Sequence, residues 1–328
     1  MTENPVSTTA ATKQLPTGLA LVLGMVAGGV LASQIRINAS LGQRLDSSLL
    51  AALISFAVGL TVLSLVVAAR PASRDGLRRL RAARLPAWQF LSGVIGACSV
   101  TTFIVVVPTI GVAVFTVAAV TGQIFGGLLV DRLGVSPNGK RPLTAMRAAA
   151  AALAVCGIVV TQLGKPVGDI EVALIALAFF VNVAVALQMA LNGRLIKAAG
   201  DAMAATTVHF GLGLVTIVLL LACSAAFGGF SPHSWPTDWW LYSGGAIGVV
   251  FIAALAICVR ALDVFLVALA INGGQLLGAL LIDGLLPDGP GVTGFLIAGA
   301  VLAIGAVVVG GNPRLAKFGR KPADASEV

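Results

Sequence analysis

The segment Thr17–Asn38 reads TGLALVLGMVAGGVLASQIRIN and contains a single charged residue, Arg36. An α-helix of about 20 residues crosses the hydrocarbon core of a bilayer, so this run has the length and polarity of one membrane span. Such runs recur, and the sequence predicts ten spans. Their approximate limits are 17–38, 48–69, 87–107, 111–131, 143–163, 171–192, 203–227, 239–259, 263–283 and 291–311. The runs lack the alternation typical of β-barrel strands, so we expect an all-α integral membrane protein.

The composition of the chain agrees with this fold class. Of 328 residues, 58% are hydrophobic and 10% are charged, whereas about 25% of the residues in a typical soluble domain are charged. A water-soluble fold of this size could not cover its surface with so few charges. The net charge of +8 comes from Lys and Arg residues in short segments between the apolar runs. This placement indicates a lipid bilayer with anionic headgroups as the partner, and no nucleic acid.

The positive charges also predict the orientation of the spans. One basic segment, Arg70–Arg84, follows the second run, and another, Arg132–Arg147, follows the fourth. The positive-inside rule places both segments in the cytoplasm. With ten spans, both termini are then cytoplasmic, and only Arg36, Arg44 and Lys165 lie on the outer side.

The two halves of the chain resemble each other. At an offset of 154 residues, and then of 152, the matches include Gln34 with Gln188, Asn38 with Asn192, Gly122-Gln123 with Gly274-Gln275, and Asp131 with Asp283. Each half holds five spans, and because five is odd, the second copy must enter the membrane in the opposite direction. Inverted repeats of this kind are a scaffold of secondary transporters. The expected organisation is a disordered cytoplasmic tail (1–16), a first five-helix repeat (17–164), a second, inverted repeat (165–311) and a basic cytoplasmic tail (312–328).

Several of these motifs are similar to those of one known family. The stretch Gln34–Gly42 (QIRINASLG) followed by Leu49–Phe56, together with Thr121–Gln123, Asp131 and Arg141–Thr144, resembles the YdcZ-like family of the drug/metabolite transporter superfamily. The resemblance implies that the chain is a fused double copy of a five-span unit and a multi-pass protein of the bacterial inner (plasma) membrane. It also implies a carrier fold, but no particular substrate.

Polar side chains inside a span are costly and are therefore functional candidates. Near the middle of the membrane the sequence places Thr121, Gln123, Asn182, Asn272 and Gln275. At the interface of the two repeats these groups would form a neutral, hydrogen-bonding site for substrate. The alternative is that they only hold helices together. Close helix approach is predicted at two GxxxG steps, formed by Gly122, Gly126, Gly274 and Gly278.

A second polar set lies nearer the ends of the spans. It consists of Gln34, Asn38, Gln188, Asn192 and Arg36. Hydrogen bonds that gate a pathway are one interpretation, and helix capping is the alternative for Asn38 and Asn192. Arg36 either extends to the membrane surface or attracts an anionic substrate. His209, in the seventh run, either carries a proton or bonds a neighbouring helix.

These residues favour a secondary carrier that moves a small solute by alternating access. The aspartates 131, 263 and 283 all lie at span ends, and no glutamate occurs between Glu3 and Glu171. The related small multidrug-resistance transporters exchange protons for cationic drugs through a glutamate in their first helix. A neutral, zwitterionic or anionic solute is therefore favoured here. Spans one, three, four, six, eight and nine are expected to wall the cavity, and spans five and ten to brace it.

Two other classes of function remain as alternatives. A membrane enzyme would need acids, histidines or metal ligands gathered at one interface. The chain has two histidines and four isolated cysteines, so we expect no enzyme activity, catalytic residue, metal or cofactor. A non-transporting helper subunit that binds a partner protein is the second alternative. As a fused double copy, the chain is expected to act as a monomer or a homodimer.

Overall fold

The computed structural model describes residues 16–135, 140, 144–163, 168–227, 235–262, 264–285 and 291–311. Apart from Pro16, the predicted tails fall outside these residues. All regular elements in the described residues are helices, which confirms the all-α prediction. The α-helices are α1 (Thr17–Leu45), α2 (Ser48–Ala69), α3 (Pro71–Ala82), α4 (Leu91–Leu133), α5 (Ala145–Thr161), α6 (Asp169–Ala199), α7 (Ala202–Ala226), α8 (Gly244–Ala261), α9 (Val264–Leu285) and α10 (Gly294–Gly311); the short 3₁₀ helices are η1 (Ala87–Phe90) and η2 (Trp239–Ser243).

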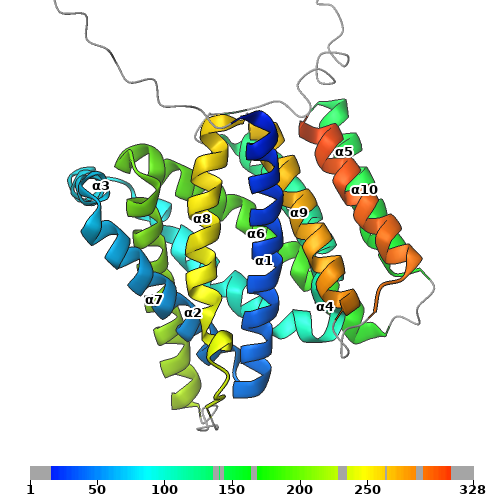
Figure 1. Cartoon of the computed structure of the whole chain (residues 1–328), viewed down its shortest axis with the longest axis horizontal. Coiled ribbons are helices and arrows are strands. Elements are labelled where there is room, and N and C mark those ends of the chain that lie inside the picture. The colour runs from blue at the N-terminus through cyan, green and yellow to red at the C-terminus, as the bar shows by residue number, and fades with distance from the viewer. Residues whose placement is uncertain are drawn as a thin grey trace, which may run out of the picture.

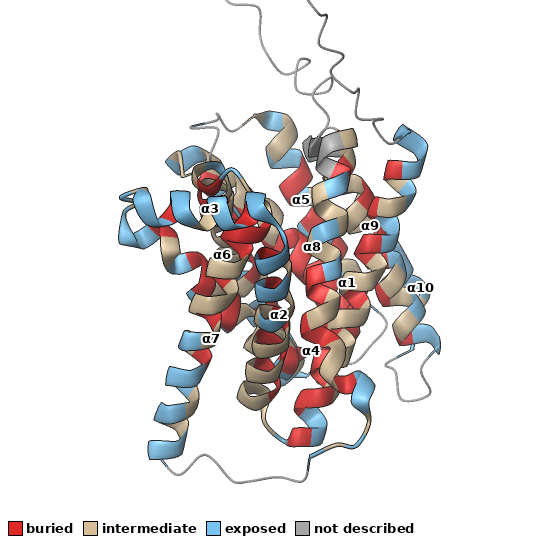
Figure 2. Ribbon diagram, turned by 60° about the vertical axis from the view of Figure 1, so that its left-hand side comes forward, coloured by how far each residue is buried: buried red, intermediate tan, exposed pale blue. Residues whose placement is uncertain are grey.

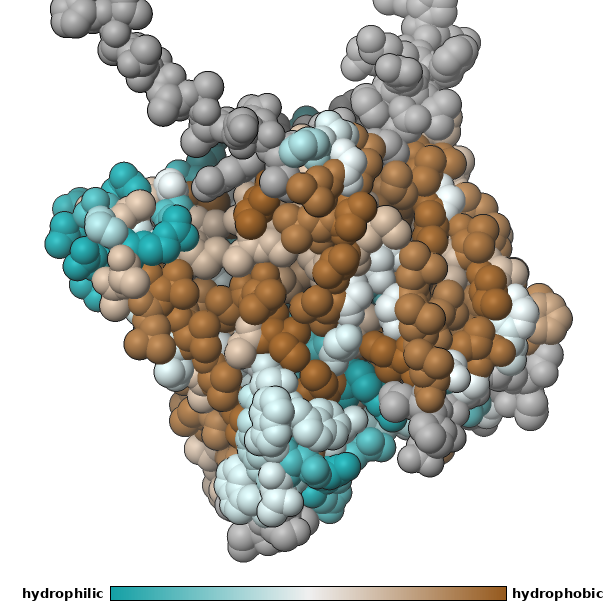
Figure 3. Space-filling view, viewed as in Figure 1, coloured by the Kyte–Doolittle hydropathy of each residue, from teal (hydrophilic) through white to brown (hydrophobic). Residues whose placement is uncertain are grey.

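The helices form a bundle with an apolar outer surface. Hydrophobic residues cover most of the flank in Figure 3, while hydrophilic residues gather around α3 and at the other end of the bundle. Buried residues concentrate on the inward sides of α1, α4 and α6 (Figure 2). In the described part, seven helical segments are long and apolar enough to cross a membrane. One of them, Ala87–Leu133, contains a backbone break, and α5 and α10 add two shorter apolar helices.

The break lies at Gly111, where the chain reverses direction. Gly111 has φ 83° and ψ 164°, a conformation that only glycine adopts readily. Arg194 of α6 contacts both ends of α4. Its Nε donates to the carbonyl of Val135, just after α4, at 2.7 Å, and its guanidinium lies 5.1 Å from the ring of Trp88, just before α4. Both ends of α4 therefore lie on the same face, and the two predicted spans 87–107 and 111–131 are separate passes.

The two faces of the bundle differ in what they carry. We call the end that holds α3, the start of α1 and the end of α10 the terminal face (Figure 1), and the other end the opposite face. Helix α3 was not predicted as a separate element. Its Leu80 packs on Ala199 at the end of α6, and its Arg79 Nε donates to the Ala199 carbonyl at 2.7 Å. Helix α6 thus ends on the face where its repeat counterpart α1 begins, so the two halves are inverted.

The turns of the two halves repeat the same local structure. Helix α1 ends at Asp46 with φ 47°, and the next residue, Ser47, accepts a hydrogen bond from the Leu50 N–H at 3.2 Å. At the equivalent turn, Gly200 has φ 68° and Asp201 accepts from the Ala204 N–H at 2.9 Å. A left-handed residue that ends one helix, followed by a side-chain cap that begins the next, forms the same tight turn twice.

Packing between the halves follows the repeat as well. A Cβ on Gly126 of α4 would lie 2.7 Å from the Cβ of Ala186 in α6, and a Cβ on Gly278 of α9 would lie 3.3 Å from that of Ala32 in α1. Gly126 is the counterpart of Gly278, and Ala186 that of Ala32. The rings of Phe56 and Phe210, which are also counterparts, are 5.1 Å apart. These contacts between symmetry-related pairs agree with two inverted five-helix repeats.

We predict that Gly274→Ala destabilises the protein while Gly273→Ala does not. A Cβ at Gly274 would come 2.6 Å from the Met25 Cα, a backbone atom of α1, whereas a Cβ at Gly273 meets nothing within 4 Å. Overpacking costs about 1–3 kcal/mol, so the melting temperature of purified Gly274→Ala should fall by several degrees. Equal melting temperatures for the two variants would contradict this helix contact.

Candidate functional site

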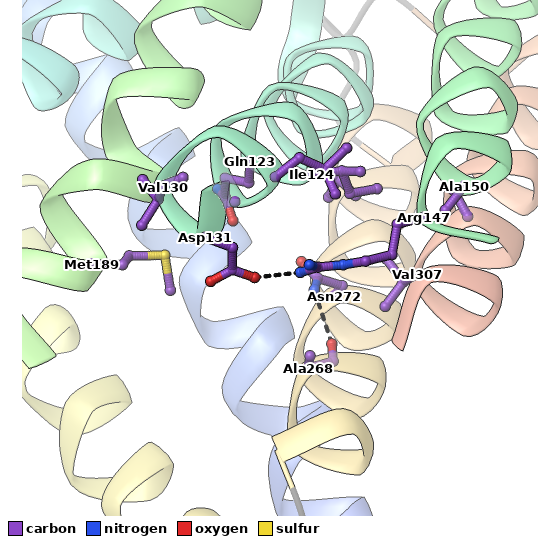
Figure 4. A pocket seen from close by; sticks show the side chains of 15 residues that line it. Gln123, Ile124, Val130, Asp131, Arg147, Ala150, Met189, Ala268, Asn272 and Val307 are labelled. Carbon is purple, nitrogen blue, oxygen red and sulfur yellow. Dashed lines mark hydrogen bonds and ion pairs between the residues drawn. The ribbon is translucent and has the colours of Figure 1, made fainter. Parts of the chain in front are cut away.

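A pocket of about 400 Å³ lies among α4, α5, α6, α9 and α10 (Figure 4). Its polar lining consists of Gln123, Asp131, Arg147 and Asn272. Most of the remaining wall is apolar, and includes Val120, Ile124, Leu128, Met189 and Val307. A mainly apolar cavity with a few convergent polar groups is the usual form of a small-molecule site.

The pocket lies in the half of the bundle next to the terminal face. Asp131 stands near the end of α4, Arg147 near the start of α5, and Val307 near the end of α10. All three of these helix ends belong to the terminal face. Met189, which also lines the pocket, is 58% exposed, so the pocket reaches the surface of the bundle beside α6.

Asp131 and Arg147 form an ion pair inside the pocket (Figure 4). The Arg147 Nη2 donates to the Asp131 Oδ2, and the two side chains are only 24% (Arg) and 15% (Asp) exposed. Thr144 caps α5 by accepting a hydrogen bond from the Arg147 N–H at 3.3 Å, which places Arg147 in the first turn. This pair was not predicted as a site, because Asp131 was placed at a span end and Arg147 in the basic segment that follows the fourth run. An arginine inside the fifth apolar run was the available signal.

Two of the predicted amides line the pocket. The Gln123 Nε2 donates to the Asn182 Oδ1 at 3.2 Å, and the Asn272 Nδ2 donates to the Ala268 carbonyl at 2.9 Å. Asn182 is buried and its own Nδ2 donates to the Ala178 carbonyl at 2.8 Å, so it orients Gln123 from α6. These bonds leave the oxygen atoms and the second N–H of Gln123 and Asn272 available for a solute.

The other two midplane candidates lie elsewhere. Thr121 is fully buried, and its Oγ1 donates to carbonyls of Val117 and Ala154 at 2.8 and 3.1 Å, so it joins α4 to α5. Gln275 is 6% exposed and does not belong to the pocket lining. Its backbone N lies where a Cβ on Gly28 would approach to 2.6 Å. The structure thus brings Gln123 and Asn272 into the pocket lining, with Asn182 bonded to Gln123 behind it, and leaves Thr121 and Gln275 outside.

The expectation that spans five and ten only brace the cavity is wrong. Arg147 and Ala150 of α5 and Ala306 and Val307 of α10 line the pocket. The two helices pack directly on each other, and a Cβ on Gly157 would lie 3.0 Å from the carbonyl oxygen of Gly299. Such close contact brings the start of α5 and the end of α10 to the same edge of the pocket.

Asn38 and Asn192 do not cap helices, so that alternative is also wrong. Helix α1 continues to Leu45 and α6 to Ala199, which places both asparagines in helix interiors. The Asn38 Nδ2 instead donates to the Ser55 Oγ of α2 at 3.2 Å. Residues beyond the predicted run, as far as Leu45, stay helical because Leu41 and Leu45 pack into the core with α2 and α4.

The remaining members of the second polar set lie outside the pocket lining. Gln34 and Gln188 occupy equivalent contacts: their Nε2 atoms lie 2.6 and 3.6 Å from the Cβ positions that Gly248 and Gly96 would have. Arg36 is half-buried within α1.

His209 is a buried residue of α7 beside the first pass of α4. Its Nε2 lies 2.8 Å from the Cβ position of Gly96, and its Nδ1 has no hydrogen-bond partner among the described residues. It does not line the pocket. Neither proton transfer nor helix bonding by His209 is tested by this geometry, so both stay predictions.

Asp283, the repeat counterpart of Asp131, makes a different contact. It is 1% exposed; its Oδ1 accepts from the Val112 N–H at 3.2 Å and its Oδ2 from the Ala113 N–H at 2.7 Å. These N–H groups start the second pass of α4, where a helix leaves its donors unpaired and carries partial positive charge. The end of α9 is thereby fixed to the Gly111 turn on the opposite face. The sequence had placed Asp283 at a span end without assigning it a partner.

Comparisons with known proteins agree with this architecture. The chain matches a family described as "Putative inner membrane exporter, YdcZ" twice, over residues 19–160 and 173–309. A solved structure described as "Crystal structure of protein" is similar in fold, with 20% sequence identity, a TM-score of 0.59, and coverage of 92% of this chain and 98% of that one. No curated protein matches the chain. The two family matches cover both halves, so the chain belongs to the YdcZ family of multi-pass inner-membrane transporters as a double copy.

Proposed function

We propose that the protein is a secondary transporter that moves a small neutral, zwitterionic or anionic solute across the inner membrane by alternating access. In this proposal the terminal face is cytoplasmic, as the positive charges predict. The pocket of Gln123, Asn272, Asp131 and Arg147 receives the solute from that side. One chain supplies both halves of the mechanism, so a monomer suffices.

The observation that carries this proposal is a difference between equivalent contacts on the two faces. On the opposite face, Asp283 binds the N–H groups of Val112 and Ala113. On the terminal face, its counterpart Asp131 is paired with Arg147 and lines the open pocket. Two inverted halves that are closed at one end and open at the other are the arrangement that alternating access requires.

A second pair of equivalent contacts differs in the same sense. Asn38 donates to Ser55 across α1 and α2. The counterparts are Asn192 and His209, and the His209 Nδ1 is buried without a hydrogen-bond partner among the described residues. The Oδ1 atoms of both asparagines, Asn38 and Asn192, are also buried and unpaired there, so the difference lies in the Asn38–Ser55 bond. Unpaired buried polar atoms cost about 1–3 kcal/mol each. In the proposed exchange of conformations, the Asn38–Ser55 bond breaks and a bond between Asn192 and His209 forms in its place.

The repeat also predicts what the other form looks like. Ala268, Gln123 and Asp131 line the present pocket, and their counterparts at an offset of 152 are Thr116, Gln275 and Asp283. Gln275 would then line the pocket that opens to the other side. Val120 and Asn272 are counterparts of each other and both line the present pocket. They would therefore contact the solute in both forms.

Cysteine labelling tests the exchange of accessibility. In a background without the native cysteines, a membrane-impermeant maleimide should label Ala268→Cys from the cytoplasmic side, whereas Thr116→Cys, at a fully buried position, should react slowly from either side. Adding Asp283→Asn should raise labelling of Thr116→Cys from the outer side and lower that of Ala268→Cys. An asparagine has one acceptor oxygen for the two N–H groups, so the closed contact weakens by about 1–3 kcal/mol, or roughly fivefold to 150-fold in population.

Asp75→Asn is the matched control, since the ion pair of Asp75 in the described part of the chain is with Arg78 on exposed α3. It should leave both labelling rates unchanged. If Asp283→Asn leaves the labelling rate of Thr116→Cys unchanged, alternating access at this site is contradicted.

The pocket itself is tested by solute-induced thermal stabilisation. Amino acids, polyamines, organic anions and quaternary cations would be screened against the purified protein, because a ligand of the native state raises its melting temperature. Gln123→Ala should weaken binding of a stabilising solute about fivefold, the effect of one hydrogen bond of about 1 kcal/mol. Gln43→Ala removes an exposed amide outside the pocket and should change nothing. Equal effects of the two variants would place the solute elsewhere.

A further inference from the structure

The pocket carries two full charges of opposite sign among its lining residues. Asp131 and Arg147 are paired with each other and largely shielded from solvent. Their charges cancel, so the empty pocket is neutral. The carboxylate and the guanidinium lie side by side on the wall that α4 and α5 form (Figure 4).

The second half of the chain does without such a pair. The sequence of α10, the counterpart of α5, holds no charged residue between Gly294 and Gly311. Asp283, the counterpart of Asp131, binds backbone N–H groups instead. The second half thus has the same order of five helices without an ion pair at this position, so the order of helices does not by itself require the pair in the first half. The Asp131–Arg147 pair lies in the pocket on the side of the terminal face.

A buried ion pair of this kind discriminates between ligands by their net charge, because a ligand must bind one or both members of the pair. A monoanion that binds Arg147 brings a negative charge next to Asp131, and a monocation that binds Asp131 meets Arg147. Either ligand adds one uncompensated charge to a mainly apolar cavity, which is costly. A net-neutral molecule with a cationic and an anionic group a few ångströms apart avoids this cost, because each of its groups faces a protein group of opposite sign.

We propose that the pocket binds a zwitterion of the α-amino acid type, with its ammonium group on the Asp131 carboxylate and its carboxylate on the Arg147 guanidinium. This inference rests on the proposed transport function and names the substrate class of the same pocket. The planar guanidinium of Arg147 suits a carboxylate because it can donate two parallel hydrogen bonds. The apolar wall of Val120, Ile124 and Leu128 accepts an apolar side chain, and Gln123 and Asn272 supply the remaining polar atoms.

The test compares ligands that share a side chain and differ only in charge. Alanine, leucine and phenylalanine would each be titrated as the free amino acid, as the N-acetyl derivative (an anion) and as the amide (a cation) against the purified full chain. At least one free amino acid should bind at least tenfold more tightly than both of its derivatives. Asp131→Asn should lose this preference and favour the N-acetyl anion, whereas Arg147→Gln should favour the amide cation.

Two further variants separate binding from stability. Arg132→Gln removes a neighbouring exposed charge outside the pocket and should keep the wild-type preference. The exchanged variant Asp131→Arg/Arg147→Asp keeps the pocket neutral and should retain a preference for the free amino acid. Unliganded melting temperatures of all variants show whether each one is folded.

Three outcomes would overturn the inference. They are a wild-type preference for the anion or the cation, no binding of any of the nine ligands, and single variants that melt earlier but keep the wild-type charge preference. None of these outcomes bears on the labelling experiment, which tests whether Thr116 and Ala268 exchange their accessibility. If that exchange occurs and no zwitterion binds, the transporter stands and the substrate class is wrong. If the exchange is absent, the transport proposal itself fails.

Discussion

The contact of the Asp283 carboxylate with the N–H groups of Val112 and Ala113 is the constraint on which the rest of the structure depends. It joins the end of the ninth apolar run, in the second half, to the Gly111 reversal in the first half. The carboxylate satisfies donors at the start of a helix, in an environment where water is scarce and unpaired N–H groups are costly. The Arg44–Asp238 ion pair also joins the two halves on the opposite face, but it is half-exposed, whereas Asp283 is buried.

The Asp283 contact has no equivalent among the described residues of the first half, although the backbones of the two halves are similar. Local structure is repeated closely, as in the turns at Ser47 and Asp201 and in the packing of Gly126 and Gly278. The contacts of the charged side chains differ between the halves: Asp131 pairs with Arg147, whereas Asp283 binds backbone N–H groups. In the proposed mechanism, the repeated backbone would allow a second arrangement of similar energy in which these polar contacts are exchanged, which is the physical basis of a two-state carrier.

Most of the fold could be predicted from the sequence because the bilayer leaves few alternatives for an apolar chain. The ten runs, the inverted repeat and the packing glycines all follow from run length, parity and spacing. Gln123 and Asn272 could also be placed, since amides within apolar runs stand out. Gln275 could not be separated from them, because the sequence gives it the same depth and only the three-dimensional packing shows that it is buried outside the pocket lining.

Other features depend on long-range packing that spacing does not contain. The Asp131–Arg147 pair joins two runs across a loop, and the Asp283 cap joins residues of the two halves more than 160 positions apart. Helix α3 is too polar to be predicted as a membrane span. Its position depends on the packing of Leu80 in one hydrophobic cluster with Ala199. The place of α5 and α10 in the pocket wall follows from their close contact at Gly157, whereas the pattern of their sequences suggested helices that only brace the bundle.

Hydrogen–deuterium exchange of the wild-type protein tests the central claim, that the two halves exchange one closed contact for its mirror image. The peptides to follow are the first turn of the second α4 pass, Val112–Thr116, and its counterpart at the start of α9, Val264–Ala268. Exchange would be measured with and without a stabilising solute. We expect opposite changes: the solute should raise the protection of one segment and lower that of the other. Protection that rises or falls in both segments together, or that changes in neither, would contradict the account.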